Sequence, residues 1–330
     1  MCRASSGPYR RGMTTQLHEV PLDRDDMVVE TRGLTKRFDD RTAVDSVDLQ
    51  VPRGVAFGYL GPNGAGKTTL IRMLLGLTSA SAGEMALLGL PLPRDRARAL
   101  ARVGAIVEEP RFHGHLTGRE NLEIVAAVRG GDAYRRIGES LERVGLTARA
   151  GDRVKTYSMG MRQRLGIARC LLADPELLIL DEPMNGLDPA GILEFRGFVR
   201  SFVEEGRTIV LSSHLLDEVE KTCDHVAIVD RGRVVVQGSI AELREDGNPT
   251  VLVQTRDPLA TAGLLSTHPA VTRATAEGST VHAVLADLAV VPELNRLLVS
   301  AGQDVLRLEP AQASLEDRFL EITTRLENAA

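Results

Sequence analysis

The chain has 330 residues, enough to bury a sizeable core in one large domain or two smaller ones. A formal net charge of −5 argues against a general nucleic-acid binder, and an aromatic content of 3% without Trp offers no obvious stacking platform for single strands. No apolar run approaches the roughly 18 residues that a membrane-spanning helix needs, so we expect any membrane role to come through a partner chain.

The three cysteines, Cys2, Cys170 and Cys223, lie far apart and lack metal-binding spacing. They are typical of reduced thiols in a cytosolic protein. Residues 1–26 carry several arginines but no apolar region, so we expect neither a signal peptide nor a membrane anchor there. Because this segment also lacks core-forming residues, it is predicted to be disordered.

From residue 27 the hydrophobic pattern predicts alternating strands and helices. Residues 27–31 and 46–51 alternate apolar and polar side chains, as half-buried strands do. Three short apolar runs predict buried strands, at residues 55–60, 177–180 and 208–212. Helices are expected at residues 68–77 and 191–205. This order predicts an α/β fold in which a mostly parallel sheet is covered by helices.

Residues 116–146 differ from their surroundings, because their apolar positions recur at helical spacing without a strand pattern. We expect them to form a helical subdomain, over about residues 111–156, inserted between strands. The whole first domain is expected to span residues 27–244.

A turn-rich stretch, Glu245-Asp246-Gly247-Asn248-Pro249, marks the next boundary. Beyond it, strands are predicted at 250–255, 271–276, 280–285 and 305–308, with helices at 258–266, 292–300 and 314–326. Ser314 and Asp317 fit an N-cap pair for the last helix. The order is that of a small α+β ferredoxin-like domain over residues 250–330. Its role, regulatory or dimer-stabilising on one reading and purely structural on the other, stays open.

The strongest motif is a glycine loop that follows the predicted strand at 55–60 and precedes a helix. It reads Gly61-Pro62-Asn63-Gly64-Ala65-Gly66-Lys67-Thr68, which satisfies G-x-x-x-x-G-K-[ST] in the context that this motif requires. Backbone N–H groups of such a loop curl around phosphate oxygens at a helix N-terminus. Lys67 is expected to bridge the β- and γ-phosphates and Thr68 to ligate Mg²⁺. The predicted nucleotide-binding set also includes Thr69.

A second motif is the acidic pair at the end of the predicted strand 177–180. Asp181 stands at the strand end, where it is expected to hold Mg²⁺ through water. Glu182 follows directly and is expected to polarise the attacking water as a general base. Alone, such a pair is often an ordinary strand end, but beside a phosphate loop it indicates phosphoryl chemistry.

A third motif lies before the acidic pair. Tyr157-Ser158-Met159-Gly160-Met161-Arg162-Gln163-Arg164 stands just upstream of the acidic pair and resembles the L-S-G-G-Q signature of ABC transporter ATP-binding subunits. The resemblance covers roughly residues 28–238. It implies ATP and Mg²⁺ as cofactors and two subunits that sandwich two ATP molecules, each signature facing the nucleotide of the other subunit. Ser158 and Gly160 keep the family pattern, whereas Met159 and Met161 depart from it.

Further matches are weak singly and strong together. Asn185-Gly186-Leu187-Asp188 resembles the D-loop, in which Asp188 touches the partner subunit. His214 matches the switch histidine, which is expected to contact the γ-phosphate and to hold Glu182 and the water in place. Phe38 occupies the slot where an aromatic ring stacks on adenine.

One departure is informative. Family members usually carry a glutamine before the helical subdomain, and here Glu108 takes that slot, with Glu109 as the register alternative. The resemblance implies a metal-side role for Glu108 at the site and contact of this loop with the membrane partner. The acidic loop and the signature resemble the bacitracin-resistance, lantibiotic-immunity and multidrug exporter branch. A simple solvated acidic turn is the alternative reading.

The resemblance therefore implies an ATPase subunit that drives a separate polytopic permease, exporting a peptide antibiotic, drug or lipid-like compound. We expect a homodimer, or a pair with a related subunit, in the cytoplasm at the inner face of the cell membrane, with no nucleic-acid partner. Two alternatives are a soluble ABC ATPase acting on nucleic acid or the ribosome, and a regulatory nucleotide binder that does not hydrolyse ATP. A single phosphate loop and the absence of long heptad runs count against the former, and Asp181, Glu182 and His214 count against the latter.

Overall fold

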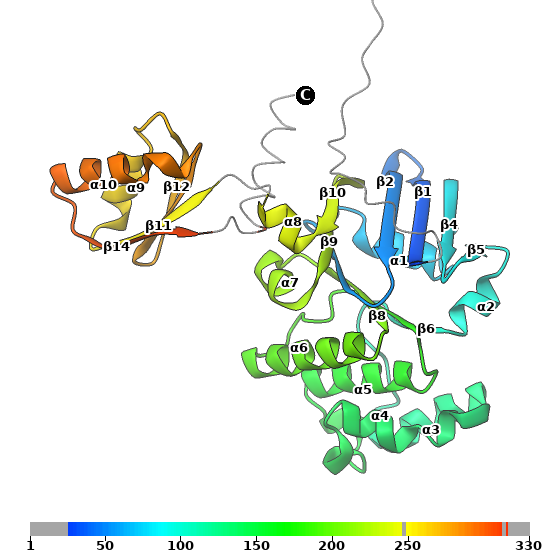
Figure 1. Ribbon diagram of the computed structural model, residues 1–330. Helices are drawn as coiled ribbons and strands as arrows, with labels where there is room; N and C mark the ends of the chain where they lie inside the picture. Colours follow the sequence, from blue (N-terminus) through cyan, green and yellow to red (C-terminus); the bar gives the residue numbers. More distant parts are fainter. Residues whose placement is uncertain (1–25, 246–248, 312–314, 316–330) are drawn as a thin grey trace, which may run out of the picture.

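The computed structural model describes residues 26–245, 249–311 and 315 (Figure 1). The predicted segment 1–26 lies outside the described residues except for Asp26, as does the predicted helix 314–326 except for Leu315. Within the described ranges, no helix is both long enough and apolar enough to cross a bilayer.

The central element is a six-stranded sheet in the order β10-β9-β3-β8-β7-β6. Its strands pair in parallel, apart from the antiparallel pair of β9 and β10. The strands are β3 (Ala56–Leu60), β6 (Val103–Ile106), β7 (Leu177–Leu180), β8 (Thr208–Ser213), β9 (His225–Asp230) and β10 (Arg233–Ser239). The predicted mostly parallel sheet is confirmed, and it brings the ends of β3, β7 and β8 to one edge.

Alternate residues of β7 explain why its sequence is apolar throughout. Leu178 and Leu180 join one hydrophobic core, whereas Leu177 and Ile179 join another on the opposite face of the sheet. All four side chains are fully buried. Burial of each such side chain contributes about 1.5–3 kcal/mol, so β7 is held firmly and can fix the acidic residues that follow it.

A second, antiparallel sheet has the order β2-β1-β4-β5. It consists of β1 (Met27–Phe38), β2 (Arg41–Pro52), β4 (Ala82–Leu87) and β5 (Leu90–Leu92). The first two strands are longer than the predicted 27–31 and 46–51, because both continue into the hairpin that joins them.

The helices are α1 (Lys67–Leu74), α2 (Arg96–Leu100), α3 (Gly118–Arg129), α4 (Ile137–Arg143), α5 (Met159–Leu171), α6 (Pro189–Glu204), α7 (Leu216–Thr222) and α8 (Ile240–Glu245). Helices α3 and α4 lie in the predicted helical insert and pack beside α5 (Figure 1). Thr117 and Glu120 form a capping box that fixes the start of α3.

The C-terminal unit contains β11 (Thr250–Thr255), α9 (Pro258–Leu265), β12 (Val271–Glu277), β13 (Thr280–Leu285), α10 (Val291–Ser300) and β14 (Val305–Ala311). Its antiparallel sheet has the order β12-β13-β11-β14, which is the ferredoxin-like arrangement. Figure 1 shows α9 and α10 beside this sheet, and a core of its own fills the space between them. The α+β class predicted for this unit is confirmed.

Candidate nucleotide site

The glycine loop runs from the buried end of β3 to the start of α1. Gly64 and Gly66 have φ of 84° and 98°, a region in which only glycine is comfortable. A Cβ atom on Gly66 would collide with the carbonyl oxygen of Ala43, and one on Gly61 would collide with that of Val229. The loop backbone is therefore held tightly between β2 and β9, with the N-terminus of α1 behind it.

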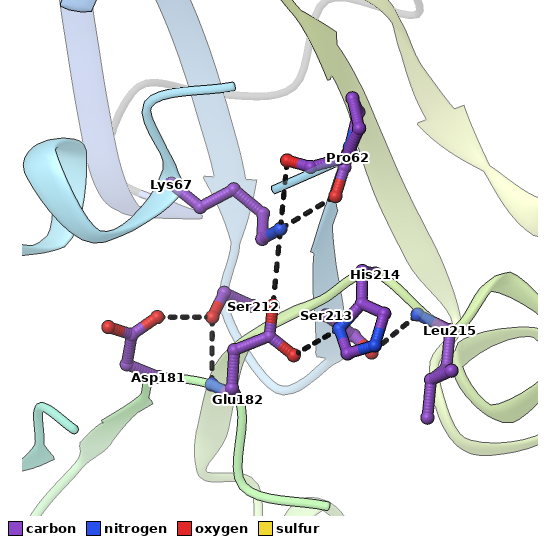
Figure 2. A network of polar contacts seen from close by, with 9 residues as sticks. Pro62, Lys67, Asp181, Glu182, Ser212, Ser213, His214 and Leu215 are labelled. Carbon is purple, nitrogen blue, oxygen red and sulfur yellow. Dashed lines mark hydrogen bonds and ion pairs between the residues drawn. The ribbon is translucent and has the colours of Figure 1, made fainter. Parts of the chain in front are cut away.

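Lys67 is held inside this loop, with only 6% of its surface exposed. Its ammonium donates to the carbonyl oxygens of Gly61 at 2.6 Å and Pro62 at 3.3 Å. The same Nζ lies 3.1 Å from Oε1 of Glu182 (Figure 2). A compact positive charge thus stands at the mouth of the loop, where it can exchange these oxygens for those of a phosphate.

The acidic pair is organised by a serine, Ser212, that belongs to none of the predicted motifs. Asp181 is 5% exposed, and its Oδ1 accepts a 2.5 Å hydrogen bond from the hydroxyl of Ser212 on β8. The backbone N–H of Glu182 donates to the same hydroxyl at 2.8 Å (Figure 2). Ser212 therefore fixes the carboxylate of Asp181 and the backbone of Glu182 relative to β8. A hydroxyl at the end of a buried strand forms no motif by itself, so no sequence pattern indicated this role.

Glu182 also contacts His214. Nδ1 of His214 lies 2.9 Å from Oε2 of Glu182, so the two carboxylate oxygens face a histidine and a lysine respectively (Figure 2). Glu182 has φ of 48°, an uncommon value for a residue with a Cβ. The structure thus brings together Lys67, Glu182 and His214 from three separate segments.

Glu108 and Glu109 both lie on a cavity of about 430 Å³ that is also lined by Thr68, Asp181 and Glu182. The Glu108 carboxylate forms an ion pair with Arg72 of α1. Its backbone has φ of 61°, again unusual for a residue other than glycine. Both candidate residues for the glutamine slot therefore line the same cavity, and the partner of Glu108 was not predicted.

The signature residues form the start of α5. Ser158 is the N-cap, and its hydroxyl accepts from the N–H of Met161 at 3.2 Å. Met159 is 43% exposed, and its thioether packs against Gly186, where a Cβ atom would collide with it. Both Met159 and Gly186 line the 430 Å³ cavity. In this chain the signature thus contacts the D-loop of the same subunit.

Hydrogen bonds fix the D-loop at both ends. The N–H of Asn185 donates to the carbonyl oxygen of Glu182 at 3.1 Å. Asp188 caps α6, with its carboxylate accepting from the N–H of Gly191 at 2.8 Å. The side chain of Asp188 therefore has a structural role in the subunit itself.

Phe38 ends β1 with 47% of its surface exposed. The ammonium of Lys36 lies 4.8 Å from its ring centroid. Across the hairpin, Arg41 donates to the carbonyl oxygen of Gly64 at 3.1 Å, which ties this hairpin to the glycine loop. An exposed aromatic face beside the loop is suited to stacking on a base.

The two cysteines within the described residues are buried thiols. Burial raises the pKa of Cys170 to about 11 and also raises the pKa of Cys223. Neither thiol is activated as a nucleophile at neutral pH.

A phosphate loop, an acidic strand end and a helical subdomain define a P-loop ATPase of the cassette type. The ABC transporter family model matches residues 44–185. The chain is 41% identical to the ABC transporter ATP-binding protein YhcH of Bacillus subtilis (strain 168), over 90% of this chain and 96% of that protein. The chain therefore belongs to the ATP-binding subunits of ABC transporters, and it is an ATPase.

Two further relatives have named transport roles. The bacitracin transport ATP-binding protein BcrA of Bacillus licheniformis is 40% identical, over 89% of this chain and 97% of that one. The Nod factor export ATP-binding protein I of Neorhizobium galegae is 36% identical, over 98% of this chain and 92% of that protein. The predicted resemblance to the bacitracin branch is confirmed, and these comparisons give no support to the alternative of a nucleic-acid or ribosome factor.

Solved structures agree with the fold. The structure of cbiO1 from Clostridium perfringens, part of the ABC transporter complex cbiONQ, has a TM-score of 0.62 at 27% identity. The matched region covers 67% of this chain and 92% of the cbiO1 chain. The predicted ABC ATPase core is thereby confirmed.

Proposed function

We propose that the chain powers an exporter whose membrane-spanning part is a separate polytopic permease, with a peptide antibiotic, drug or lipid-like compound as cargo. The transport roles in the names of BcrA and the Nod factor export protein support this proposal. The membership of cbiO1 in a transporter complex supports a permease partner. Such a partner would hold the chain at the cytoplasmic face of the membrane.

The observation that carries the catalytic part of the proposal is the environment of Glu182. One of its oxygens faces the Lys67 ammonium and the other faces the His214 imidazole. In this assignment Glu182 takes the proton of the attacking water, while His214 orients the Glu182 carboxylate. Lys67 and the glycine loop bind the phosphates, and Phe38 stacks on adenine.

The residues at the cavity fit Mg²⁺. Thr68 and Asp181 supply a hydroxyl and a buried carboxylate to one cavity, which Glu108 also lines. Among the described residues, no group of three or more His, Cys, Asp or Glu side chains forms a metal site. At this cavity a magnesium ion would be held by few carboxylates together with phosphate oxygens. Bound there, Mg²⁺ would neutralise charge on the transferred phosphoryl group.

The dimeric part of the proposal concerns the signature. Ser158 and Met159 are exposed at the start of α5, where helix N–H groups favour an anion. We assign Ser158, Met159, Gly160 and Met161 to the nucleotide of a second copy, and Asp188 to the contact between copies. ATP binding would then close the pair and hydrolysis would reopen it.

The test of the exporter proposal uses cells that lack their own bacitracin transporter. They would express this chain together with a candidate permease, and the growth-inhibiting concentrations of bacitracin and unrelated amphiphilic drugs would be measured. We expect resistance to at least one compound, and expect it to be lost with Glu182→Gln. If the complex takes the compound up instead of exporting it, the proposed direction of transport is wrong. If the complex binds the membrane and hydrolyses ATP but the cells stay equally sensitive to every compound, the proposed class of cargo is wrong.

A further inference from the structure

Arg72 lies in the last turn of α1, the helix that begins with Lys67 and Thr68. Because residues four apart share a helix face, Arg72 is on the same face as Thr68. Its guanidinium reaches Glu108, on the loop after β6, and forms an ion pair with it. One short helix thus carries a phosphate-binding lysine at one end and a partner for Glu108 at the other.

The cavity that Thr68 lines is rich in negative charge. Four carboxylates line it, from Glu108, Glu109, Asp181 and Glu182, against one guanidinium, that of Arg162. A triphosphate adds further negative charge at the same place, and like charges a few ångströms apart repel each other. Lys67 is paired with Glu182, and Arg72 is the cation paired with Glu108.

Glu108 is also held in an unusual backbone conformation. Its φ of 61° is strained for a residue with a Cβ, so surrounding contacts must maintain it. The ion pair with Arg72 is one such contact, although 62% of the Glu108 side chain is exposed. The carboxylate is therefore kept at the cavity wall by a partner on α1.

From this geometry we infer that Arg72 is a positioning residue, which fixes the Glu108 carboxylate beside the phosphate loop and compensates its charge so that the site accepts a triphosphate. The inference rests on the proposed function, because it takes the cavity to hold the phosphates. It assigns to Arg72 no contact with nucleotide. Removing the guanidinium leaves a carboxylate that repels the phosphates, and removing both charges relieves that repulsion.

The test is a double-mutant cycle of Arg72→Gln and Glu108→Gln, read by the binding of a fluorescent ATP analogue to the full chain. Without Mg²⁺, we expect Arg72→Gln to weaken binding by about two- to fivefold, the range of a partly exposed ion pair. Adding Glu108→Gln should restore most of the affinity. With Mg²⁺ or raised salt the loss should shrink, because both reduce repulsion between carboxylate and phosphate.

Three control variants distinguish the effect of the lost positive charge from an effect of the substitution on folding. Arg72→Lys should retain near wild-type binding, since it keeps the positive charge. Glu109→Gln should not rescue Arg72→Gln, although Glu109 lines the same cavity. Arg96→Gln removes a guanidinium that donates to the carbonyl oxygen of Gly76 at 3.1 Å and not to a carboxylate of the cavity, and it should not change binding.

Additive effects in the cycle, or rescue by Glu109→Gln, would overturn the inference. So would an affinity loss in Arg72→Gln that is independent of salt. Failure of the proposed function looks different, because wild type and Glu182→Gln would then also fail to bind the analogue.

Discussion

His214 and Glu182 stand 32 positions apart in the chain, yet Nδ1 of the histidine lies 2.9 Å from Oε2 of the glutamate. The contact joins the loops after β8 and β7, two neighbouring strands of the parallel sheet. We predict that His214→Ala lowers the rate of ATP hydrolysis by about 10²- to 10⁴-fold, as loss of a catalytic proton-transfer arrangement does. Nucleotide affinity should change little. Steady-state hydrolysis and equilibrium binding, measured on the same preparations, check both statements, and an unchanged rate would contradict the assignment.

Ser212 is expected to matter for stability as well as for activity. Ser212→Ala removes the donor to Asp181 and leaves the N–H of Glu182 without its acceptor. Buried groups that lose a partner cost about 1–3 kcal/mol each, so the free energy of unfolding should fall by an amount of this order. Urea unfolding measures this. Ser201→Ala is a matched control, because its exposed hydroxyl donates to a carbonyl oxygen of its own helix, and it should have a much smaller effect.

Phe38 is predicted to recognise the base rather than the phosphates. Phe38→Ala should weaken ATP binding by about tenfold, in the range of one base–aromatic stack. Phe38→Tyr should bind ATP normally, since it keeps the ring. Competition by inorganic triphosphate gives the contrast: its affinity should be the same in all three proteins, and an equal loss for triphosphate would show that Phe38 acts through the loop instead.

Met159 and Gly186 are predicted to be energetically coupled. Gly186→Ala places a side chain at φ of 73° and against the Met159 thioether. The backbone part alone should cost about 1–2 kcal/mol. In a Met159→Ala background the clash is gone but the backbone cost remains, so the substitution should destabilise less than in wild type. Chemical denaturation of the four proteins tests this, and identical losses in both backgrounds would refute the contact.

The sequence was sufficient to predict the phosphate loop, because its glycine spacing has a direct conformational cause. Gly64 and Gly66 adopt the positive φ values that the loop requires. The same holds for β7, whose four apolar residues face two cores. The C-terminal fold was also predictable, since alternation and turn residues mark each strand.

Other features left no comparable pattern. Strands β4 and β5 are short and partly exposed, and neither has a clear pattern of its own. Strand β4 pairs with β1, and β5 pairs with β4. Ser212 sits in a buried strand where a hydroxyl carries no motif. The ion pair between Arg72 and Glu108 joins α1 to a loop 36 positions further along the chain. It could not be predicted from the sequence, because it depends on the path that this loop takes in the fold.

The most direct measurement of the central claim is the mass of the Glu182→Gln protein in solution, by light scattering, with and without Mg-ATP. The substitution keeps the loop and the signature but removes the proposed base, so bound ATP should persist. We predict a monomer without nucleotide and a dimer retaining two ATP molecules when Mg-ATP is added. A monomer that retains no nucleotide would contradict the account.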